Sequence, residues 1–290
     1  MNLTYIIGVV LSLVVFFVGI VLGINIGPKA VEAGLQTFVF TPGNLWNFFD
    51  AASIFITIGC TFAIVVASFP GKTLGSIPKH FGIILNAKKF DPMYFIDQLV
   101  ELAQTARKNG LLSLEEKANE QTDPFFKQAI MLIVDANDPD KVRAVLENDI
   151  ECMSARHEDA AALYDKASSV APAFGMVGTL VGLINMLNNM SLDGGGASSL
   201  GKDMGTALIT TLYGCILAHI VFGPIANNLR IRDSEEVLCK SIIVEGIMSI
   251  QSGENPKTLK EKLLTYVDQK ARGEDGGGGG GKKKGKKGEE

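Results

Sequence analysis

The sequence predicts an all-α integral membrane protein with four transmembrane helices and a helical cytoplasmic domain between the second and third of them. Four stretches contain no Asp, Glu, Lys or Arg, and each reaches the roughly 20 residues that a membrane-spanning helix needs. Hydrophobic residues make up 47% of the 290 positions, and the mean hydropathy of +0.24 exceeds that of ordinary soluble domains. Lysines and arginines follow the second and fourth stretches, which sets the predicted orientation.

The predicted spans are residues 1–28, 51–71, 167–192 and 204–229. The first has no basic segment before its apolar run and no small-residue cleavage site, so we expect a retained anchor rather than a removed signal peptide. The connections within each pair of spans are short, whereas residues 72–166 between the pairs are long and charged. By the positive-inside rule, this central domain and both chain termini lie in the cytoplasm.

Helical patterns continue through the cytoplasmic segments. Pro92 opens a helix that ends at Asn109-Gly110, and Ser113 with Glu116 forms a capping signature for the next helix. Further helical spacings of apolar residues follow at 129–134, 142–146, 237–250 and 259–267. The predicted domains are residues 1–71, 72–166, 167–229 and 230–272, followed by a disordered Gly/Lys tail at 273–290. We favour a solvated end for this tail over a weak contact with anionic membrane lipid.

Two prolines occupy matching depths in the last two spans. Pro172 lies about five residues from the cytoplasmic end of the third span, and Pro224 lies about five residues from the same end of the fourth. Each proline lacks a backbone donor and frees a carbonyl about one turn earlier, and that carbonyl needs another partner inside a membrane. A paired hinge in an ion path is one interpretation, and two simple helix bends are the other.

Small and hydroxyl-bearing residues line the same two spans. The glycines that thin the third span, and so predict close packing of another helix backbone, are Gly175, Gly178 and Gly182. The candidate ion-path hydroxyls are Thr179, Thr210, Thr211 and Tyr213. Their oxygens suit a hard cation, although threonine hydroxyls also bond back to their own helix. We assign no role to His219.

No span holds a carboxylate in its interior, so any acid that carries an ion across the membrane must come from another chain. No nucleotide-binding, hydrolase or zinc-protease motif is present, so we predict no catalytic residue, no fixed metal site and no cofactor besides the translocated ion. A net charge of -4 without a basic stripe argues against nucleic acid as a partner. A scaffold protein whose spans serve only as an anchor is a further alternative.

Opposite charges flank the turn between two predicted cytoplasmic helices, where Arg107 ends one helix and Glu115 begins the next. Such charges are usually solvated. A protein that grips a moving partner by electrostatics presents charges in the same way, because exposed pairs steer and release rapidly.

Several separated motifs resemble those of the flagellar motor stator A subunits, the MotA and PomA family, over nearly the full chain. The matching segments are FFDAAS at 48–53 with GCT at 59–61, TARKNG at 105–110 with SLE at 113–115, PAFGMVGTL at 172–180, TTLYG at 210–214, PIA at 224–226 and EGI at 245–247. Cys60 departs from the family, which usually has a second glycine there, and this change concerns packing rather than ion passage.

The resemblance implies an inner-membrane stator subunit that conducts ions down their gradient and converts the flow into torque. Several copies, five in the family's usual assembly, would surround two copies of a MotB/PomB-type B subunit, whose transmembrane Asp binds the ion. Pro172 and Pro224 would couple ion release to motion, while Arg107 and Glu115 would contact the rotor protein FliG. Thr179 and Thr210-Thr211 resemble the sodium-driven members, so Na⁺ is favoured over H⁺.

A related alternative is an energising subunit of the ExbB or TolQ type, which shares a ring around an acid-bearing partner. Four predicted spans, rather than three, argue against it.

Overall fold

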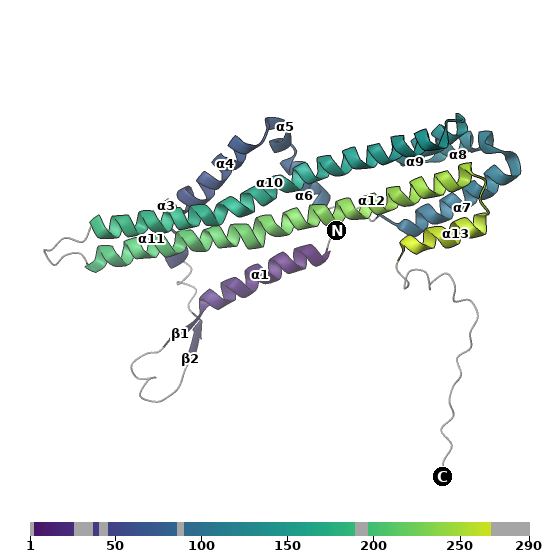
Figure 1. Ribbon diagram of the computed structural model, residues 1–290. Helices are drawn as coiled ribbons and strands as arrows, with labels where there is room; N and C mark the ends of the chain where they lie inside the picture. Colours follow the sequence, from purple (N-terminus) through teal and green to yellow (C-terminus); the bar gives the residue numbers. More distant parts are fainter. Residues whose placement is uncertain (1–2, 26–36, 41–45, 86–89, 189–196, 268–290) are drawn as a thin grey trace, which may run out of the picture. The chain divides into compact units, whose positions relative to one another are not determined.

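The chain forms two compact units, each assembled from two separate segments. The computed structural model describes residues 3–25, 37–40, 46–85, 90–188 and 197–267 (Figure 1). The first unit comprises Met1–Lys88 and Arg156–Arg232, and the second comprises Lys89–Ala155 and Asp233–Glu290. The predicted tail at 273–290 lies outside the described residues.

Long apolar helices build the first unit. Helical stretches long and apolar enough to cross a membrane occur, in the described part, at Ala51–Ser68, Pro139–Asn188 and Leu200–Gln251. The first of these consists of α3 (Ala51–Ile54), η2 (Phe55–Gly59) and α4 (Cys60–Ser68) in direct succession. Helix α1 (Leu3–Val21) is also apolar, but its apolar stretch Tyr5–Val21 is shorter than these three. A helical protein with membrane-crossing segments is therefore confirmed. The span predicted over residues 1–28, and with it the total of four, stays a prediction.

A two-stranded antiparallel hairpin that the sequence did not predict follows α1. Strand β1 (Leu22–Asn25) pairs with β2 (Thr37–Phe40), with Leu22 opposite Phe40. The helix expected over residues 1–28 therefore ends at Val21. Gly23 and Asn25 are poor helix formers, which explains why the helix stops inside an apolar run.

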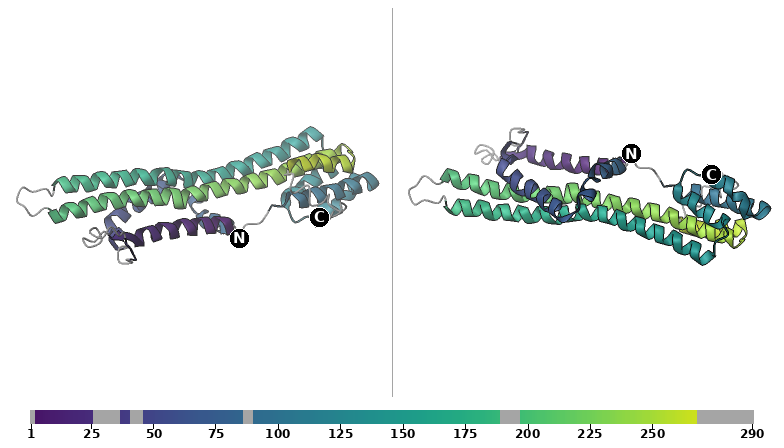
Figure 2. Two further views of the ribbon diagram at one scale, coloured as in Figure 1. Left: turned by 90° about the horizontal axis from the view of Figure 1, so that it is seen from below. Right: turned by 90° about the horizontal axis from the view of Figure 1, so that it is seen from above.

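The third and fourth predicted spans form an antiparallel helix pair. Helix α10 (Pro139–Asn188) and helix α11 (Ala197–Ile216) run side by side in both Figure 1 and Figure 2. The π-helical turn η4 (Leu217–Phe222) follows α11 and leads directly into α12 (Gly223–Gln251). Helix α10 contains the boundary between the two units at Ala155 and Arg156, and α12 contains the boundary at Arg232 and Asp233. Neither helix ends at the domain bounds that were predicted at residues 166 and 229.

Two short helices after α4 pack against α10. These are α5 (Gly71–Leu74) and α6 (Ile77–Leu85). His80 of α6 is buried, and its Nδ1 lies 3.2 Å from the Tyr164 hydroxyl of α10. Burial lowers the pKa of His80, because the charged imidazolium loses its hydration there. Ile84, one turn further along α6, is also buried in the same apolar cluster as Tyr164.

The second unit contains the helices α7 (Pro92–Asn109), η3 (Leu111–Ser113), α8 (Leu114–Glu120), α9 (Pro124–Val134), α13 (Pro256–Leu263) and η5 (Leu264–Tyr266). Helix α7 begins and ends at its predicted positions, and shorter helices cover other predicted apolar spacings. Asp91, Asp123 and Asn255 each cap a helix whose first residue is proline, by accepting a bond from a backbone N–H.

The predicted capping role of Ser113 is wrong. Ser113 lies in the 3-10 turn η3 with helical backbone angles, and its hydroxyl donates to the Gly110 carbonyl at 2.7 Å. Its oxygen therefore does not face the free N–H groups at the start of α8. Gly110 adopts a φ of 84°, a conformation that favours glycine, and this residue ends α7.

The core of the second unit collects the apolar faces that the helical spacing predicts. Its fully buried large side chains are Ile96, Leu99, Leu102, Leu114, Phe126, Ile130, Ile133, Leu146, Ile242, Ile243 and Ile247. Each such side chain contributes about 1.5–3 kcal/mol relative to an exposed position. Gly246 allows α12 to approach α7, because a Cβ there would lie 2.5 Å from Leu99 Cδ1.

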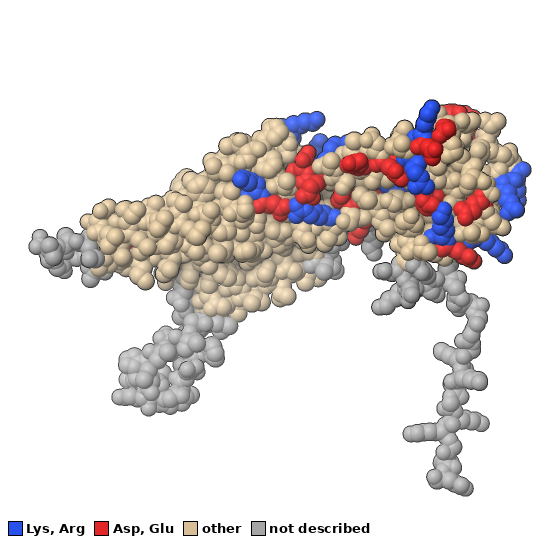
Figure 3. Space-filling model, in the orientation of Figure 1, with Lys and Arg blue, Asp and Glu red and all other residues tan. Residues whose placement is uncertain are grey.

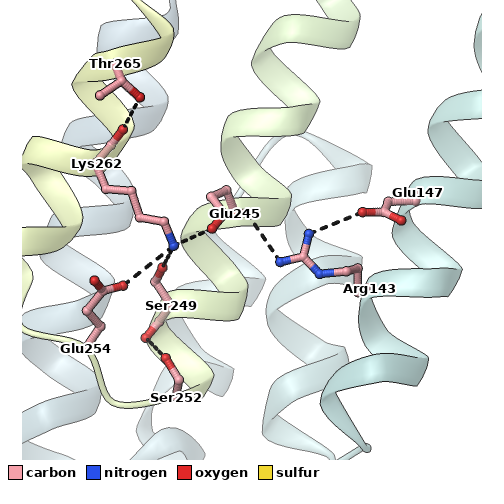
Figure 4. Close-up of polar contacts among 8 residues, drawn as sticks. All are labelled: Arg143, Glu147, Glu245, Ser249, Ser252, Glu254, Lys262 and Thr265. Atoms are coloured by element: carbon pink, nitrogen blue, oxygen red, sulfur yellow. Dashed lines mark hydrogen bonds and ion pairs between the residues drawn. The ribbon is translucent and has the colours of Figure 1, made fainter.

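Charged side chains connect three helices at the edge of this core (Figure 4). Glu245 of α12 accepts from Arg143 Nη2 of α10 at 3.3 Å and forms an ion pair with Lys262 of α13. The hydrogen bond from Lys262, more than any other contact, holds the pKa of Glu245 below its ordinary value. Glu245 belongs to one of the motifs that carry the family resemblance, and its contacts give it a structural role.

Candidate ion path between the third and fourth spans

The α10–α11 pair offers an apolar outer surface. On the face shown in Figure 3, the surface over α11 and the adjoining end of α10 is free of Lys, Arg, Asp and Glu. Three large apolar side chains of this pair are exposed: Met176 (61%) and Leu180 (60%) of α10, and Leu208 (61%) of α11. Side chains of this size meet lipid or another chain when the helices stand in a membrane.

Glycines bring the backbones of α10 and α11 into direct contact. A Cβ at Gly178 would lie 2.0 Å from Thr210 Cγ2, and one at Gly182 would lie 2.8 Å from Ala207 Cβ. A Cβ at Gly175 would lie 3.1 Å from the Thr211 Cα. Each of these distances is shorter than an ordinary contact between carbon atoms, so only glycine fits without moving the helices.

Two of the predicted hydroxyls meet across this contact. Thr179 Oγ1 lies 2.5 Å from Thr211 Oγ1, and both residues are half-buried. Thr179 Oγ1 also lies 3.0 Å from the Ala207 carbonyl of α11 and 3.2 Å from the Gly175 carbonyl of its own helix. The pair thus places two hydroxyl and two carbonyl oxygens together, which is the ligand type that hard cations prefer.

Thr210 does not join this pair. Its side chain is buried and faces the second span, where Thr210 Oγ1 lies 3.0 Å from Ser53 Oγ and 2.5 Å from the Thr206 carbonyl. Ser53 in turn donates to Asp50 Oδ2 at 2.6 Å. Thr57 donates to the carbonyl of Thr210 at 3.3 Å. Thr210 therefore connects the fourth span to the second.

Sequence reasoning missed this polar seam of the second span. Ser53, Thr57 and Thr61 are almost fully buried, with exposures of 0%, 0% and 1%. They repeat every four residues along a helix that carries no charge, which places all three on one helix face. That spacing is the signal from which the seam could have been predicted.

Tyr213 and the two prolines lie away from the hydroxyl pair. The Tyr213 hydroxyl donates to the Phe48 carbonyl, which precedes α3. Pro172 lies within the unbroken helix α10, and a Cβ at Gly214 of α11 would lie 3.1 Å from its Cα. Pro224 is the second residue of α12 and directly follows the π-helical turn η4. His219 lies in this turn with an exposed side chain.

Arg107 and Glu115 belong to the second unit. Arg107 is exposed in the last turn of α7, and Glu115 is exposed in the first turn of α8. A cation at a helix C-terminus and an anion at a helix N-terminus both complement the helix dipole. Leu112, which is 76% exposed, lies between them in the turn.

Among the described residues, no cluster of three or more His, Cys, Asp and Glu side chains could hold a metal ion. The hydroxyl pair at Thr179 and Thr211 likewise has no carboxylate among its hydrogen-bond partners. Four oxygens without a negative charge can hold water or part of a cation's ligand shell, but they do not balance the charge of an ion inside a membrane.

Comparisons with known proteins show which family and which proteins this chain is similar to. Residues 117–242 match the MotA/TolQ/ExbB proton channel family. Motility protein A of Borreliella burgdorferi is 39% identical over 252 residues, which cover 87% of this chain and 94% of that protein. Chemotaxis protein PomA of Vibrio alginolyticus is 38% identical over 230 residues, covering 79% of this chain and 88% of that protein. The flagellar MotAB stator complex of Bacillus subtilis contains a chain with a TM-score of 0.74 and 29% identity, covering 85% of this chain and 94% of that one.

Proposed function

This chain belongs to the MotA/PomA family of flagellar motor stator A subunits, and we propose that it conducts the coupling ion past the Thr179–Thr211 hydroxyl pair. As a stator subunit it is a multi-pass membrane channel component of the motility machinery, and its relatives are not enzymes. The observation that carries the proposal is the meeting of two threonine hydroxyls between α10 and α11, with no carboxylate among their hydrogen-bond partners.

The missing acid is the basis for the proposed partner. A B subunit of the MotB/PomB type supplies a transmembrane Asp, which binds the ion while Thr179 and Thr211 provide neutral oxygens beside it. The exposed Met176 and Leu180 flank Thr179 on α10, so this surface suits the partner helix. Several copies of this chain, five in our proposal, surround two B subunits.

We propose four membrane spans with both termini and residues 72–166 in the cytoplasm. Helix α1 supplies the first span, and the lysines that follow α4 together with the arginines of α12 support the orientation. Residues 1–71 and 167–229 then form the membrane part, with the third and fourth spans lining the ion path. Residues 230–272 form a cytoplasmic segment.

Torque passes to the rotor through the cytoplasmic helices. Arg107 and Glu115 are exposed near one turn and carry opposite charges, which suits contact with the rotor protein FliG. One charge that falls through 100 mV releases about 2.3 kcal/mol, which is enough to bias a ring whose positions are nearly equal in energy. Pro172 and Pro224 supply the bends that couple ion release to this motion.

The proposed coupling ion is sodium. A hydroxyl pair with carbonyl oxygens nearby matches the ligand preference of Na⁺ better than the needs of a proton relay. The chemotaxis protein PomA of Vibrio alginolyticus, one of the relatives, shares 38% identity with this chain.

The test is to express this chain with its B subunit in cells whose own stator genes are deleted. Wild-type protein is expected to restore swimming, Thr179→Ser to preserve it, and Thr179→Val to lower speed by about tenfold or more, as loss of a supporting ligand does. Thr179→Val keeps the side-chain shape and removes the hydroxyl.

Titration of sodium at constant pH identifies the ion. Speed that rises and saturates with sodium is expected. Speed that ignores sodium and collapses with the pH gradient refutes the sodium assignment. Wild-type protein that leaves the cells paralysed despite normal membrane levels refutes the stator function itself.

A further inference from the structure

The fourth span changes its hydrogen-bond register directly before Pro224. The N–H of Gly223 donates to the Ala218 carbonyl, five residues earlier, at the end of the π-helical turn η4. In a regular α-helix, residue 223 would donate to the carbonyl of His219, and residue 224 to that of Ile220. Pro224 has no N–H, so both carbonyls lose their regular donors.

A side chain of the third span bonds to the same turn. Ser168 Oγ of α10 donates to the Ala218 carbonyl at 3.0 Å, so this oxygen accepts from its own helix and from the neighbouring one. A Cβ at Gly223 would lie 3.0 Å from the Ala218 oxygen and 3.9 Å from Ser168 Oγ. Glycine at this position leaves room for both donors.

The neighbouring serine makes no such contact. Ser169 is exposed, and its hydroxyl donates at 2.9 Å to the Lys166 carbonyl of its own helix. Bonds of this kind form in any helix and do not depend on a second helix. The chain therefore contains a bridging serine and a non-bridging serine side by side.

The Gly223 N–H closes the π turn on the Ala218 carbonyl, the same oxygen that Ser168 contacts. The Ser168 hydroxyl therefore adds a bond to the carbonyl that closes this turn and does not replace the lost donors of His219 and Ile220. Short π-helical turns occur frequently at functional sites. Conversion of η4 to the α register would rewind the helix by one residue and rotate every residue beyond it relative to α10. A bond that joins α10 to the turn opposes this rotation.

We propose that Ser168 is a positioning residue that holds the fourth span in the π register, and that this turn changes register when the ion leaves toward the cytoplasm. The inference rests on the proposed stator function, because it names the contact that controls the bend at Pro224. Ser168 does not touch the ion. Its hydroxyl stabilises one of two helix registers and releases the Ala218 carbonyl in the other.

The first experiment measures amide hydrogen exchange in residues 217–223 of the purified stator complex in lipid nanodiscs. Ser168→Ala is expected to speed exchange there by roughly threefold, the factor that corresponds to an average interhelical hydrogen bond in a membrane protein. Ser168→Thr keeps the hydroxyl and is expected to restore the wild-type rate. Ser169→Ala is the matched control and leaves the rate unchanged.

The second experiment repeats the comparison in a Pro224→Ala background, where the turn can close in the α register. Ser168→Ala is then expected to have no effect on exchange, because the bond is specific to the π register. Three results would each overturn the proposal. Ser168→Ala could speed exchange equally with and without Pro224, or Ser168→Ala and Ser169→Ala could have equal effects. The third result is failure of Ser168→Thr to restore the wild-type rate.

Swimming cells separate this inference from the proposed function. With Pro224 intact, Ser168→Ala is expected to shift the half-saturating ion concentration by roughly threefold, and Ser169→Ala to leave it unchanged. A functional wild-type stator whose ion dependence is the same with Ser168→Ala refutes the role of Ser168 alone. A wild-type chain that fails to drive swimming refutes the stator function, while the exchange measurements still decide the role of Ser168.

Discussion

Replacement of Gly178 by alanine is expected to separate α10 from α11 and to break the hydroxyl pair beside it. The added Cβ would lie 2.0 Å from Thr210 Cγ2 and 2.7 Å from Thr210 Cβ. Thr210 has little freedom to turn away, because its hydroxyl lies 3.0 Å from Ser53 Oγ and 2.5 Å from the Thr206 carbonyl. The helices themselves therefore have to move.

The size of the movement follows from ordinary carbon contacts of about 3.5 Å, which require a shift of about 1.5 Å from the 2.0 Å approach. The same shift lengthens the 2.5 Å contact between Thr179 Oγ1 and Thr211 Oγ1 to about 4 Å, beyond hydrogen-bond range. Overpacking costs about 1–3 kcal/mol, and alanine returns up to about 1 kcal/mol through its better helix propensity. We expect a net destabilisation of up to about 2 kcal/mol.

The assay is unfolding of the purified complex in a detergent series, together with swimming speed in cells without other stators. Gly205→Ala is the matched control, because a Cβ at Gly205 of α11 meets nothing within 4 Å and leaves only the gain in propensity. Gly178→Ala is expected to unfold more readily than Gly205→Ala and to impair swimming. A Gly178→Ala complex as stable as the control, with normal swimming, would refute the close-packing argument.

Two further predictions concern the second unit. Glu245→Gln is expected to destabilise this unit by about 1 kcal/mol, because the ion pairs with Arg143 and Lys262 are partly exposed. Since Lys262 lowers the pKa of Glu245, this stabilisation is present above the ordinary pKa of glutamate, about 4.3, and is lost as the pH falls through the lowered value. Chemical unfolding followed by circular dichroism over a pH series tests this, and an equal acid sensitivity of Glu245→Gln and wild type would contradict it. Ser113→Ala is expected to change stability by less than about 0.5 kcal/mol, whereas Asp123→Ala, which removes a true cap at 2.9 Å from the Phe126 N–H, costs about 1 kcal/mol. An equal loss in the two variants under the same unfolding assay would restore the capping role of Ser113.

Features that depend on local sequence were predicted well. The helix over Pro92–Asn109 and its end at Gly110 follow from apolar spacing, proline and glycine. The apolar spacings at 129–134 and 259–267 likewise fall on α9 and on α13 with η5. The helical membrane character follows from charge-free length, because a bilayer tolerates few unpaired charges. The hairpin after α1 was missed because β1 lies at the end of an apolar run that also fits a helix.

The family resemblance rests on motifs that can be read from the sequence alone, and the relatives confirm it. The roles of individual site residues remain proposals. Ser53, Thr57 and Ser168 were overlooked because a hydroxyl in an apolar helix shows its importance only when its partner is known.

The sequence by itself determined that this chain crosses a membrane with helices, carries a charged helical segment between them and holds no carboxylate inside its four charge-free stretches. Only the tertiary structure decided that Thr211 faces Thr179 while Thr210 faces Ser53. Adjacent residues on a helix point in directions about 100° apart, and the rotation of a helix about its axis is set by the surfaces it packs against. The register change before Pro224 depends on Ser168 of another helix, so a pattern within one segment does not reveal it.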